Sequence, residues 1–167
     1  MISSEIQYDQ NYLRGILDRT RTIAAVGISP DPIRPSNYVG LYLSARGFKV
    51  IPVNPGKVGQ QMFGQTTVAS LRDIPESVGQ VDMVDIFRRA EHAEAIVDEA
   101  IEVLVPRGLK TIWMQFGVIN QAAAAKAEAA GLNVVMDRCP KLEHQRFFGD
   151  LRKAGLNTGI ISSKRRA

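Results

Sequence analysis

The sequence contains a single cysteine, Cys139, and two histidines, His92 and His144, among 167 residues. One cysteine excludes a disulfide within the chain and a zinc site built from several thiolates. No stretch approaches the roughly 18 apolar residues of a membrane span, and the N-terminal segment lacks the basic-then-apolar pattern of a signal peptide. These absences favour a soluble protein of a reducing compartment, and we expect it to be cytoplasmic.

Cationic residues exceed acidic ones only slightly. Lys and Arg number 21 against 17 Asp and Glu, which gives a formal net charge of +4. Lys164, Arg165 and Arg166 stand near the C-terminal end and account for most of this excess. A nucleic-acid surface would show a basic stripe with interleaved aromatic residues, and the sequence has none. We therefore expect neither a nucleic-acid partner nor a membrane partner.

The composition is that of an ordinary globular protein, with 45% hydrophobic and 23% charged residues. A chain of 167 residues fits one domain that is large enough to bury a sizeable core. No linker or internal repeat divides it. We expect a single domain over residues 1–148, including an N-terminal helix, and a loosely ordered extension over residues 149–167.

Short apolar runs rich in β-branched residues recur along the chain, as is typical of strands buried on both faces. The first run covers residues 22–28 and ends before a Ser-Pro pair, which is a turn signal. The second covers residues 49–53 and is closed by Asn-Pro-Gly. Three more runs predict strands over residues 81–87, 111–114 and 133–136.

Helical segments separate these runs. The segment at residues 36–46 begins with Ser36, a residue type that caps helices, and stops at Gly47, which suits the left-handed position after a helix. Asn120 and Gly131 bracket an alanine-rich segment in the same way. This alanine-rich helix is expected over residues 121–130. Further helices are expected over residues 4–19 and 91–105, with short helical pieces over residues 68–73 and after Pro140.

Strands that alternate with helices of crossover length predict a parallel sheet with right-handed connections and helices on both faces. The expected fold class is therefore α/β, a Rossmann-like, doubly wound sheet of five parallel strands in a single domain. Sheets of this kind bind ligands outside the carboxyl ends of their strands. Candidate functional residues are accordingly those that follow each strand.

The loop after the first strand lacks the signature of a dinucleotide site. Such a site needs three glycines in its first loop and an acidic residue after the second strand. Residues 27–36 contain only Gly27, and the second strand is followed by Asn54 and Pro55. A P-loop is absent as well, because the Gly56-Lys57 pair after the second strand is not followed by Ser or Thr. An NAD(P)-binding regulator is therefore a disfavoured alternative.

The same loop has features that suit a phosphate. Three prolines stiffen its approach to the following helix, where backbone N–H groups are available. Ser29 and Ser36 add hydroxyls, and Arg34 adds a cation. An ordinary turn that ends a strand and starts a helix would explain these residues equally well. The first loop alone does not decide between the two interpretations.

Cations also follow the next two strands. Lys57 stands in the second loop beside a glycine, where it can face the same anion as Arg34. Phe87, Arg88 and Arg89 follow the third strand, where the ring could wall an adenine while an arginine meets a phosphate or ribose. A solvated lysine in a turn, or two solvated arginines beside a buried ring, would be the ordinary reading of each loop. Charge on three adjoining loops is what favours an anionic ligand.

Several segments resemble those of the small stand-alone CoA-binding proteins, which are similar to the CoA-binding Rossmann domain at the N-terminus of the succinyl-CoA synthetase alpha subunit. The resemblance covers roughly residues 10–148, and the motifs occur in the expected order. It implies a five-stranded parallel sheet with coenzyme A bound over the first and second loops. The segments are VGISPDPIRPSNYVGLYLSARGFKVIPVNPG, SLRDIP, VDIFRRAEHAEAIVDEAI, WMQFGV and VVMDRCPKLEHQR.

The resemblance also implies which residues contact coenzyme A. The first loop would meet the ADP portion and its phosphates, and the lysine of the second loop would meet a CoA phosphate. The third segment would border the adenine or the pantetheine arm. The implied residues are Gly27, Ser29, Arg34, Pro35 and Ser36 in the first loop, Asn54, Pro55 and Lys57 in the second, Ile86, Phe87 and Arg88 in the third, and Gln115 and Gly117 in the fourth.

The resemblance implies binding without an assigned reaction. The second domain, the phosphohistidine loop and the ATP-grasp partner of the synthetases have no counterpart in this sequence. We therefore expect a protein that binds CoA or an acyl-CoA as a small-molecule ligand. A subunit or enzyme of acyl-CoA metabolism that acts with a partner chain is the main alternative, and a homo-oligomer stays open.

Residues with chemical potential follow the last strand. The Cys139 thiol stands near Arg138 and Lys141, which could lower its pKa and favour a mixed disulfide with CoA. A buried cysteine that serves as a small apolar side chain is more common. For His144, a surface ion pair or helix-capping contact near Glu143 is the more common role. We expect no catalytic residue and no metal ligand.

Overall fold

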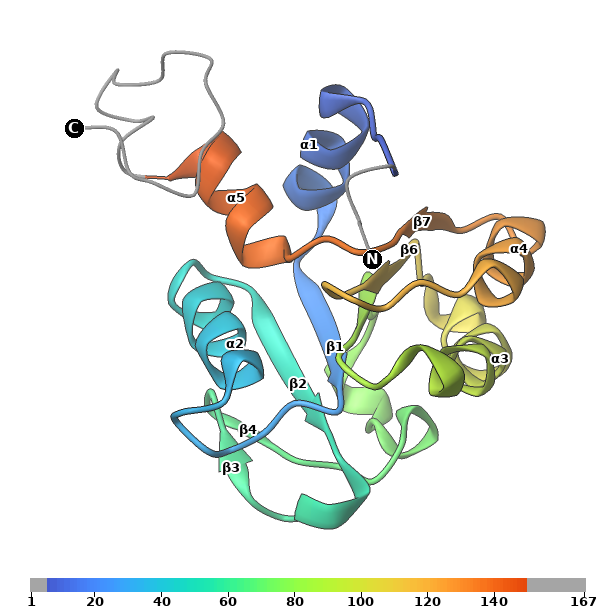
Figure 1. Cartoon of the computed structure of the whole chain (residues 1–167). Helices are drawn as coiled ribbons and strands as arrows, with labels where there is room; N and C mark the ends of the chain where they lie inside the picture. Colours follow the sequence, from blue (N-terminus) through green and yellow to red (C-terminus); the bar gives the residue numbers. More distant parts are fainter. Residues whose placement is uncertain (1–5, 150–167) are drawn as a thin grey trace.

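A central parallel sheet organises residues 6–149, the part of the chain that this computed structural model describes (Figure 1). All neighbouring strands in it run parallel. This sheet confirms the α/β, Rossmann-like fold expected from the sequence. In spatial order the strands are β2 (Lys49–Val53), β1 (Thr22–Val26), β5 (Met83–Ile86), β6 (Thr111–Met114) and β7 (Asn133–Val135).

The strand order reverses at β1. The chain passes from β1 to β2 on one side, and later returns to β5 on the other side of β1. The loops that leave β1 and β5 therefore diverge at the carboxyl edge of the sheet. In doubly wound sheets such a divergence marks the ligand crevice.

The strands are mostly apolar on both faces, as a sheet covered by two helical layers requires. All five residues of β1 are buried, and alternate side chains enter two separate cores. Ala24 and Val26 belong to one core. Ile23 and Ala25 belong to the other.

Helices cover the two faces unequally (Figure 1). The core that contains Ala24 is closed by α3 (Ala93–Val103) and α4 (Gln121–Ala129), whose buried side chains there are mostly small. The opposite core is closed by α1 (Gln10–Arg19), α2 (Pro35–Ala45) and α5 (Pro140–Phe148). The second face therefore carries two helices, α2 and α5, whose N-terminal ends follow strands at the carboxyl edge.

Several helix ends follow the sequence signals. Asn120 caps α4, with its side chain accepting a hydrogen bond from the Ala123 amide at 2.9 Å. Gly47 and Gly131 follow their helices with φ of 97° and 86°, in the left-handed region that glycine adopts at low cost. These three end assignments are confirmed.

Other boundaries differ from the sequence-based expectation. The first helix starts at Gln10, not at residue 4, because Asp9 caps it by accepting the Asn11 amide at 2.7 Å. The predicted helix over residues 91–105 is a 3₁₀ turn followed by α3 and a second 3₁₀ turn. The first strand ends at Val26, since Gly27 turns the chain away with a φ of 88°.

A small antiparallel hairpin, which follows β2 and precedes β5 along the chain, was not predicted. Its strands are β3 (Gln61–Met62) and β4 (Gln65–Thr66), joined by a turn in which Phe63 has a φ of 53° and Gly64 a φ of 77°. The Phe63 ring lies where a side chain on Gly40 of α2 would stand, within 2.4 Å of an ideal Cβ position. The hairpin therefore packs directly on α2.

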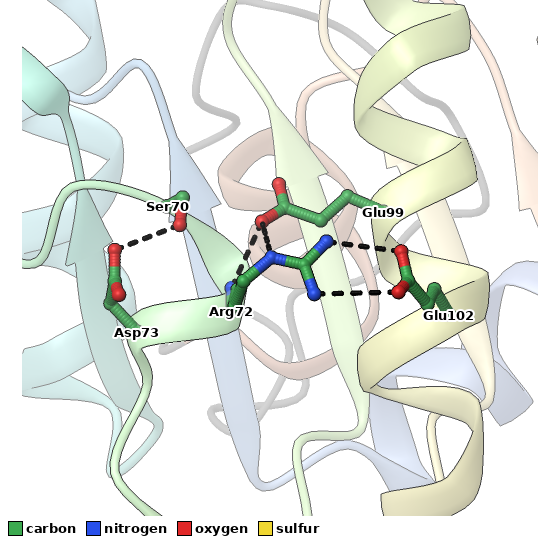
Figure 2. A network of polar contacts seen from close by, with 5 residues as sticks. All are labelled: Ser70, Arg72, Asp73, Glu99 and Glu102. Carbon is green, nitrogen blue, oxygen red and sulfur yellow. Dashed lines mark hydrogen bonds and ion pairs between the residues drawn. The ribbon is translucent and has the colours of Figure 1, made fainter.

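Polar contacts fasten the segment after this hairpin to α3, as Figure 2 shows. The backbone amide of Arg72 donates to Glu99 at 3.0 Å, and its guanidinium pairs with Glu102 at 3.0 Å. Ser70 donates to Asp73 at 2.8 Å within the same short turn. Because these ion pairs are exposed, they add little stability and mainly fix the path of the chain.

Two tyrosines of the N-terminal region protect the outer edge of the sheet. The Tyr12 hydroxyl donates to the Val134 carbonyl at 3.0 Å and accepts from the Val134 amide at 2.9 Å. The Tyr8 hydroxyl accepts from the Met136 amide at 2.7 Å. These contacts satisfy backbone groups that an edge strand such as β7 otherwise leaves open.

Two further expectations concern the C-terminal extension and membrane spans. Apart from Gly149, the expected extension over residues 149–167 lies beyond the described residues. Among the helices of residues 6–149, none has the length and apolar character needed to traverse a bilayer.

Candidate functional site

Gly27 ends β1 and brings the first and third loops into contact. Its amide donates to the Val53 carbonyl at 2.8 Å, which extends the pairing of β1 with β2. A Cβ atom at Gly27 would lie 2.7 Å from Cδ of Arg88. The Arg88 side chain therefore occupies the space that a larger residue at position 27 would need.

Hydrogen bonds fix the first loop against the start of α2. The Ser29 amide donates to Oγ of Ser36 at 3.0 Å, and the Asp31 amide donates to Oγ of Ser29 at 3.0 Å. The side-chain amide of Asn37 donates to the Ser29 carbonyl at 2.9 Å. Each serine oxygen accepts one of these bonds and retains a proton that it can donate to a further acceptor.

The expectation that Ser36 caps this helix is wrong. α2 begins at Pro35, and Arg34 holds the N-cap position without a side-chain capping bond. Proline suits the first helical position because no N–H partner is needed there. The Ser36 hydroxyl instead turns back to the loop. Arg34, with an exposed side chain, consequently stands at the positive end of α2.

Asn54 joins the second loop to the first. Its side-chain amide donates to the Ile28 carbonyl at 3.0 Å. Its side-chain oxygen caps the 3₁₀ turn Pro55–Lys57, in which the Lys57 side chain is exposed. The loop that carries Lys57 is therefore fixed beside the loop that carries Arg34.

The third loop places an aromatic ring and two arginines at the edge. Ile86 is fully buried and belongs to the core, so its side chain faces away from this surface. Phe87 is half-buried and packs on the core beneath α1, α2 and α5. Arg88 is half-buried beside Gly27, and Arg89 is exposed.

The fourth loop is tied to the segment after β7. Gly117 adopts a φ of 81°, and its amide donates to Oδ1 of Asp137 at 2.7 Å. Asp137 is buried and itself adopts a left-handed φ of 60°, which asparagine and aspartate tolerate better than most residues. The Gln115 amide donates to the Ile86 carbonyl at 3.1 Å. Sequence reasoning counted Asp137 among the residues with chemical potential after the last strand, but assigned it no contact with the ligand.

Cys139 is buried at the N-cap position of α5, with 5% of its surface exposed. Burial raises the pKa of its thiol, and the Asp85 carboxyl acts in the same direction, whereas the Leu142 amide and the Gln115 side chain act against it. A buried thiol with a raised pKa is a weak nucleophile at neutral pH.

The favoured interpretation of Cys139 as a small buried side chain is confirmed, and the alternative of a thiol activated by neighbouring cations is wrong. The Arg138 guanidinium lies over the Tyr8 ring, 5.3 Å from its centroid, and the Lys141 ammonium lies over the Tyr42 ring at 5.7 Å. The Lys141 backbone amide lowers the pKa of the thiol through a hydrogen bond, but neither cationic side chain is among the groups that lower it. Both charges are directed at aromatic faces.

His144 is buried rather than placed on the surface as expected. Its Nδ1 shares a hydrogen bond of 2.9 Å with the Tyr42 hydroxyl. The rings of Phe48 and Phe148 lie 5.4 and 5.1 Å from the imidazole. His144 therefore links α5 to α2 inside the apolar layer.

Asp85 is a buried acid that sequence reasoning passed over, because it stands inside the apolar run of β5. It is 1% exposed. Burial raises the pKa of its carboxyl well above the ordinary value, which favours the neutral acid. The sequence signal that could have identified Asp85 is a charged residue inside an otherwise apolar strand, because burying such a group is costly.

The carboxyl edge as a whole suits an anion with an extended uncharged part. Arg34, Lys57 and Arg88 stand on three loops that contact one another, beside the positive end of α2. Half-buried side chains such as Phe87 and Gln115 continue the surface toward β6. Within residues 6–149, no group of three or more His, Cys, Asp or Glu side chains is placed to hold a metal ion.

Comparisons with known proteins reveal relatives along most of the chain. The family described as "CoA binding domain" matches residues 21–145. The uncharacterized protein YneT of Bacillus subtilis (strain 168) is 34% identical over 132 residues, which cover 79% of this chain and 91% of YneT. The structure of cell-free ID.343 from Thermus thermophilus is 35% identical, with a TM-score of 0.76 over 84% of this chain and 100% of that chain.

A more distant likeness concerns the fold alone. The apo form of acetyl-coenzyme A synthetase 1 from Ca. Korarchaeum cryptofilum is 21% identical, with a TM-score of 0.53. The match covers 68% of this chain and 25% of the synthetase.

The family match at residues 21–145 includes all five strands of the sheet and the four loops described above.

Proposed function

The chain belongs to the CoA-binding domain family, and from this premise we propose that it binds coenzyme A or an acyl-CoA at the carboxyl edge of its sheet. The observation that carries the proposal is the convergence of Arg34, Lys57 and Arg88 on loops joined through Asn54 and Gly27. Coenzyme A has the matching chemistry, since a pyrophosphate and a 3′-phosphate concentrate its negative charge at one end.

The first two loops would hold these phosphates. Arg34 and the positive end of α2 would face one phosphate, to which the hydroxyls of Ser29 and Ser36 could donate. Lys57 would meet another from the adjoining loop. Pro35 and Pro55 would keep both loops rigid, so that little conformational entropy is lost on binding.

The third and fourth loops would receive the uncharged parts of the ligand. The half-buried Phe87 ring offers an apolar wall for the adenine or for the start of the pantetheine arm, beside the Arg88 cation. Gln115 and Gly117 would border the remainder of the arm. We assign no reaction to this chain. In this proposal residues 1–148 form the binding domain, and CoA is its small-molecule partner.

Calorimetric titration of the purified chain with CoA tests this proposal. Arg34→Ala and Lys57→Ala should each weaken binding by about 1–3 kcal/mol, because each removes a charge-assisted hydrogen bond to phosphate. Lys110→Ala is the matched control, since this exposed lysine precedes β6 at the opposite edge of the sheet. Unchanged affinity in both site variants would refute the phosphate assignment. Absence of CoA binding in the unmodified chain would refute the function itself.

A further inference from the structure

Three buried side-chain atoms have no hydrogen-bond partner within the described residues: Oδ1 of Asp85, Oε1 of Gln115 and Oδ2 of Asp137. Each can accept a hydrogen bond, since even a neutral carboxyl keeps an acceptor oxygen, and they come from β5, from the end of β6 and from the segment after β7. We call this set the acceptor cluster. A buried polar atom without a partner costs about 1–3 kcal/mol. Three such atoms of one kind call for a common donor.

The register of the sheet brings two members of the acceptor cluster to one face. Asp85 pairs with Trp113 of the neighbouring strand β6. Side chains repeat on a face at every second residue, so Gln115 follows Trp113 on the same face. That face is the one that α1, α2 and α5 cover, because the Trp113 side chain lies in their core.

The segment after β7 brings the third member over the end of β6. The Arg138 amide donates to the Met114 carbonyl at 3.3 Å, and the Trp113 indole donates to the Arg138 carbonyl at 2.8 Å. Asp137 reaches the loop after β6 through its bond to the Gly117 amide at 2.7 Å. The chain therefore crosses the end of β6 at residues 137–138. The Asp137 carboxyl group is held at this crossing by its bond to Gly117.

Cys139 follows directly and closes the acceptor cluster from the side of α5. Both Asp85 and Gln115 lie near enough to its sulfur to act on the pKa of the thiol. The set thus lies between the sheet and the N-terminal end of α5, at the carboxyl edge. This is the same edge at which Arg34 and Lys57 stand.

The separation from the phosphate loops fits the length of a pantetheine arm. Three strand steps separate β2 from β6, or roughly 14 Å at about 4.8 Å per step. The arm has the extended length of about four to five residues, roughly 15 Å. An arm that starts at phosphates beside Arg34 and Lys57 therefore reaches the acceptor cluster.

We propose that the acceptor cluster binds the distal end of the pantetheine arm, whose amide N–H and thiol S–H are hydrogen-bond donors. This inference rests on the proposed function and names the form of ligand that the site selects. Acylation of the sulfur removes the S–H donor and adds a group where the surrounding side chains are buried. The site therefore prefers free CoA to acyl-CoA.

A ligand series tests this selectivity on the unmodified chain. Calorimetry would compare CoA with acetyl-CoA and with desulfo-CoA, in which hydrogen replaces the thiol. CoA should bind about tenfold more tightly than either, the effect of one buried hydrogen bond. Equal affinity for all three would overturn the inference and leave CoA binding intact. No binding of any of them would instead overturn the proposed function.

A variant pair assigns the effect to the acceptor cluster. Gln115→Leu removes one acceptor at a half-buried strand end, and it should weaken the binding of CoA more than that of desulfo-CoA, so that the preference for CoA is lost. Gln121→Leu is the matched control on the exposed side of α4, and it should retain the tenfold preference. Equal weakening of both ligands by Gln115→Leu would show that the glutamine does not act on the thiol end, and would overturn the inference.

Discussion

Gly27 and Gly47 adopt similar backbone conformations in different surroundings. Their φ values are 88° and 97°, both in the left-handed region. A side chain at Gly47 would meet no atom within 4 Å, whereas a Cβ at Gly27 would lie 2.7 Å from Cδ of Arg88. The pair therefore separates backbone strain from the contact that joins the first and third loops.

We predict that Gly47→Ala lowers the free energy of unfolding by about 1 kcal/mol, the cost of a left-handed alanine. Gly27→Ala should lower it by about 2–3 kcal/mol, because Arg88 must also move. The same change should weaken CoA binding, while Gly47→Ala should not. Urea denaturation and calorimetry measure the two effects. Equal losses of stability would show that the Gly27–Arg88 contact carries no energy.

Asp85 makes stability depend on pH in an unusual direction. Its pKa is raised in the folded state, so the folded chain holds this proton more tightly than the unfolded chain. As pH rises above the ordinary aspartate pKa of about 3.9, the unfolded state ionises first. The contribution of Asp85 to the free energy of unfolding therefore falls by up to about 1.4 kcal/mol per pH unit, until pH passes the folded pKa.

Asp85→Asn removes this dependence. We predict that the variant gains stability relative to the unmodified chain as pH rises from about 5 to about 7, as followed by urea denaturation. Asp98→Asn, at an exposed carboxyl of α3, should show no such gain over this range. A constant difference between the Asp85 variant and the unmodified chain across this pH range would contradict the assignment.

At the scale of elements, the edge strand β7 depends on the N-terminal helix. Tyr12 of α1 bonds both the amide and the carbonyl of Val134 with one hydroxyl. Its partner Tyr8 lies nearly parallel to it, with ring centroids 6.1 Å apart. Burial raises the pKa of both phenols, and the bond that Tyr12 donates to the Val134 carbonyl requires its hydroxyl to stay protonated.

Removal of the Tyr12 hydroxyl should therefore loosen β7. We predict that Tyr12→Phe lowers the free energy of unfolding by about 1–3 kcal/mol, because two backbone groups of Val134 lose their partner. Amide hydrogen exchange should rise at Val134 in particular. Tyr38→Phe, on a side chain that is 52% exposed, is the matched control and should change little. A loss of equal size in the two variants would contradict this role.

The sequence indicated most elements, because hydrophobic period and turn chemistry are local signals. The strands Lys49–Val53 and Thr111–Met114 occur as predicted, since turns and apolar character bound both. The hairpin at Gln61–Met62 and Gln65–Thr66 was missed because strands of two residues are too short to show a hydrophobic period. It packs on the rest of the fold through contacts distant in sequence, with Phe63 against Gly40 and Met62 in the core.

The candidate site residues were predictable to the extent that they follow strands. Arg34, Lys57 and Arg88 could be placed at one edge from the fold class alone. The role of Ser36 was missed because a serine after proline resembles a cap, while its actual partner is the Ser29 amide. The burial of Asp137 depends on the path of the chain after β7, which no local pattern encodes.

At the scale of the whole molecule, one edge of the sheet carries the proposed binding site and another is covered by packing that stabilises the fold. Strand order places the divergence of loops at β1 and β5, where the cations converge. The lateral edge of the sheet, at strand β7, is covered by Tyr8 and Tyr12. A ligand that binds only the folded chain raises the free energy of unfolding in proportion to the logarithm of its concentration over Kd. Coenzyme A should therefore stabilise the whole sheet through its carboxyl edge.

Native mass spectrometry of the purified full chain, with and without added CoA, tests the central claim most directly. The account predicts a complex with one CoA per chain, which Arg34→Ala and Lys57→Ala both deplete and Lys110→Ala leaves intact. A chain that stays free of CoA when the ligand is in excess, or one that retains a nicotinamide dinucleotide instead, would contradict it.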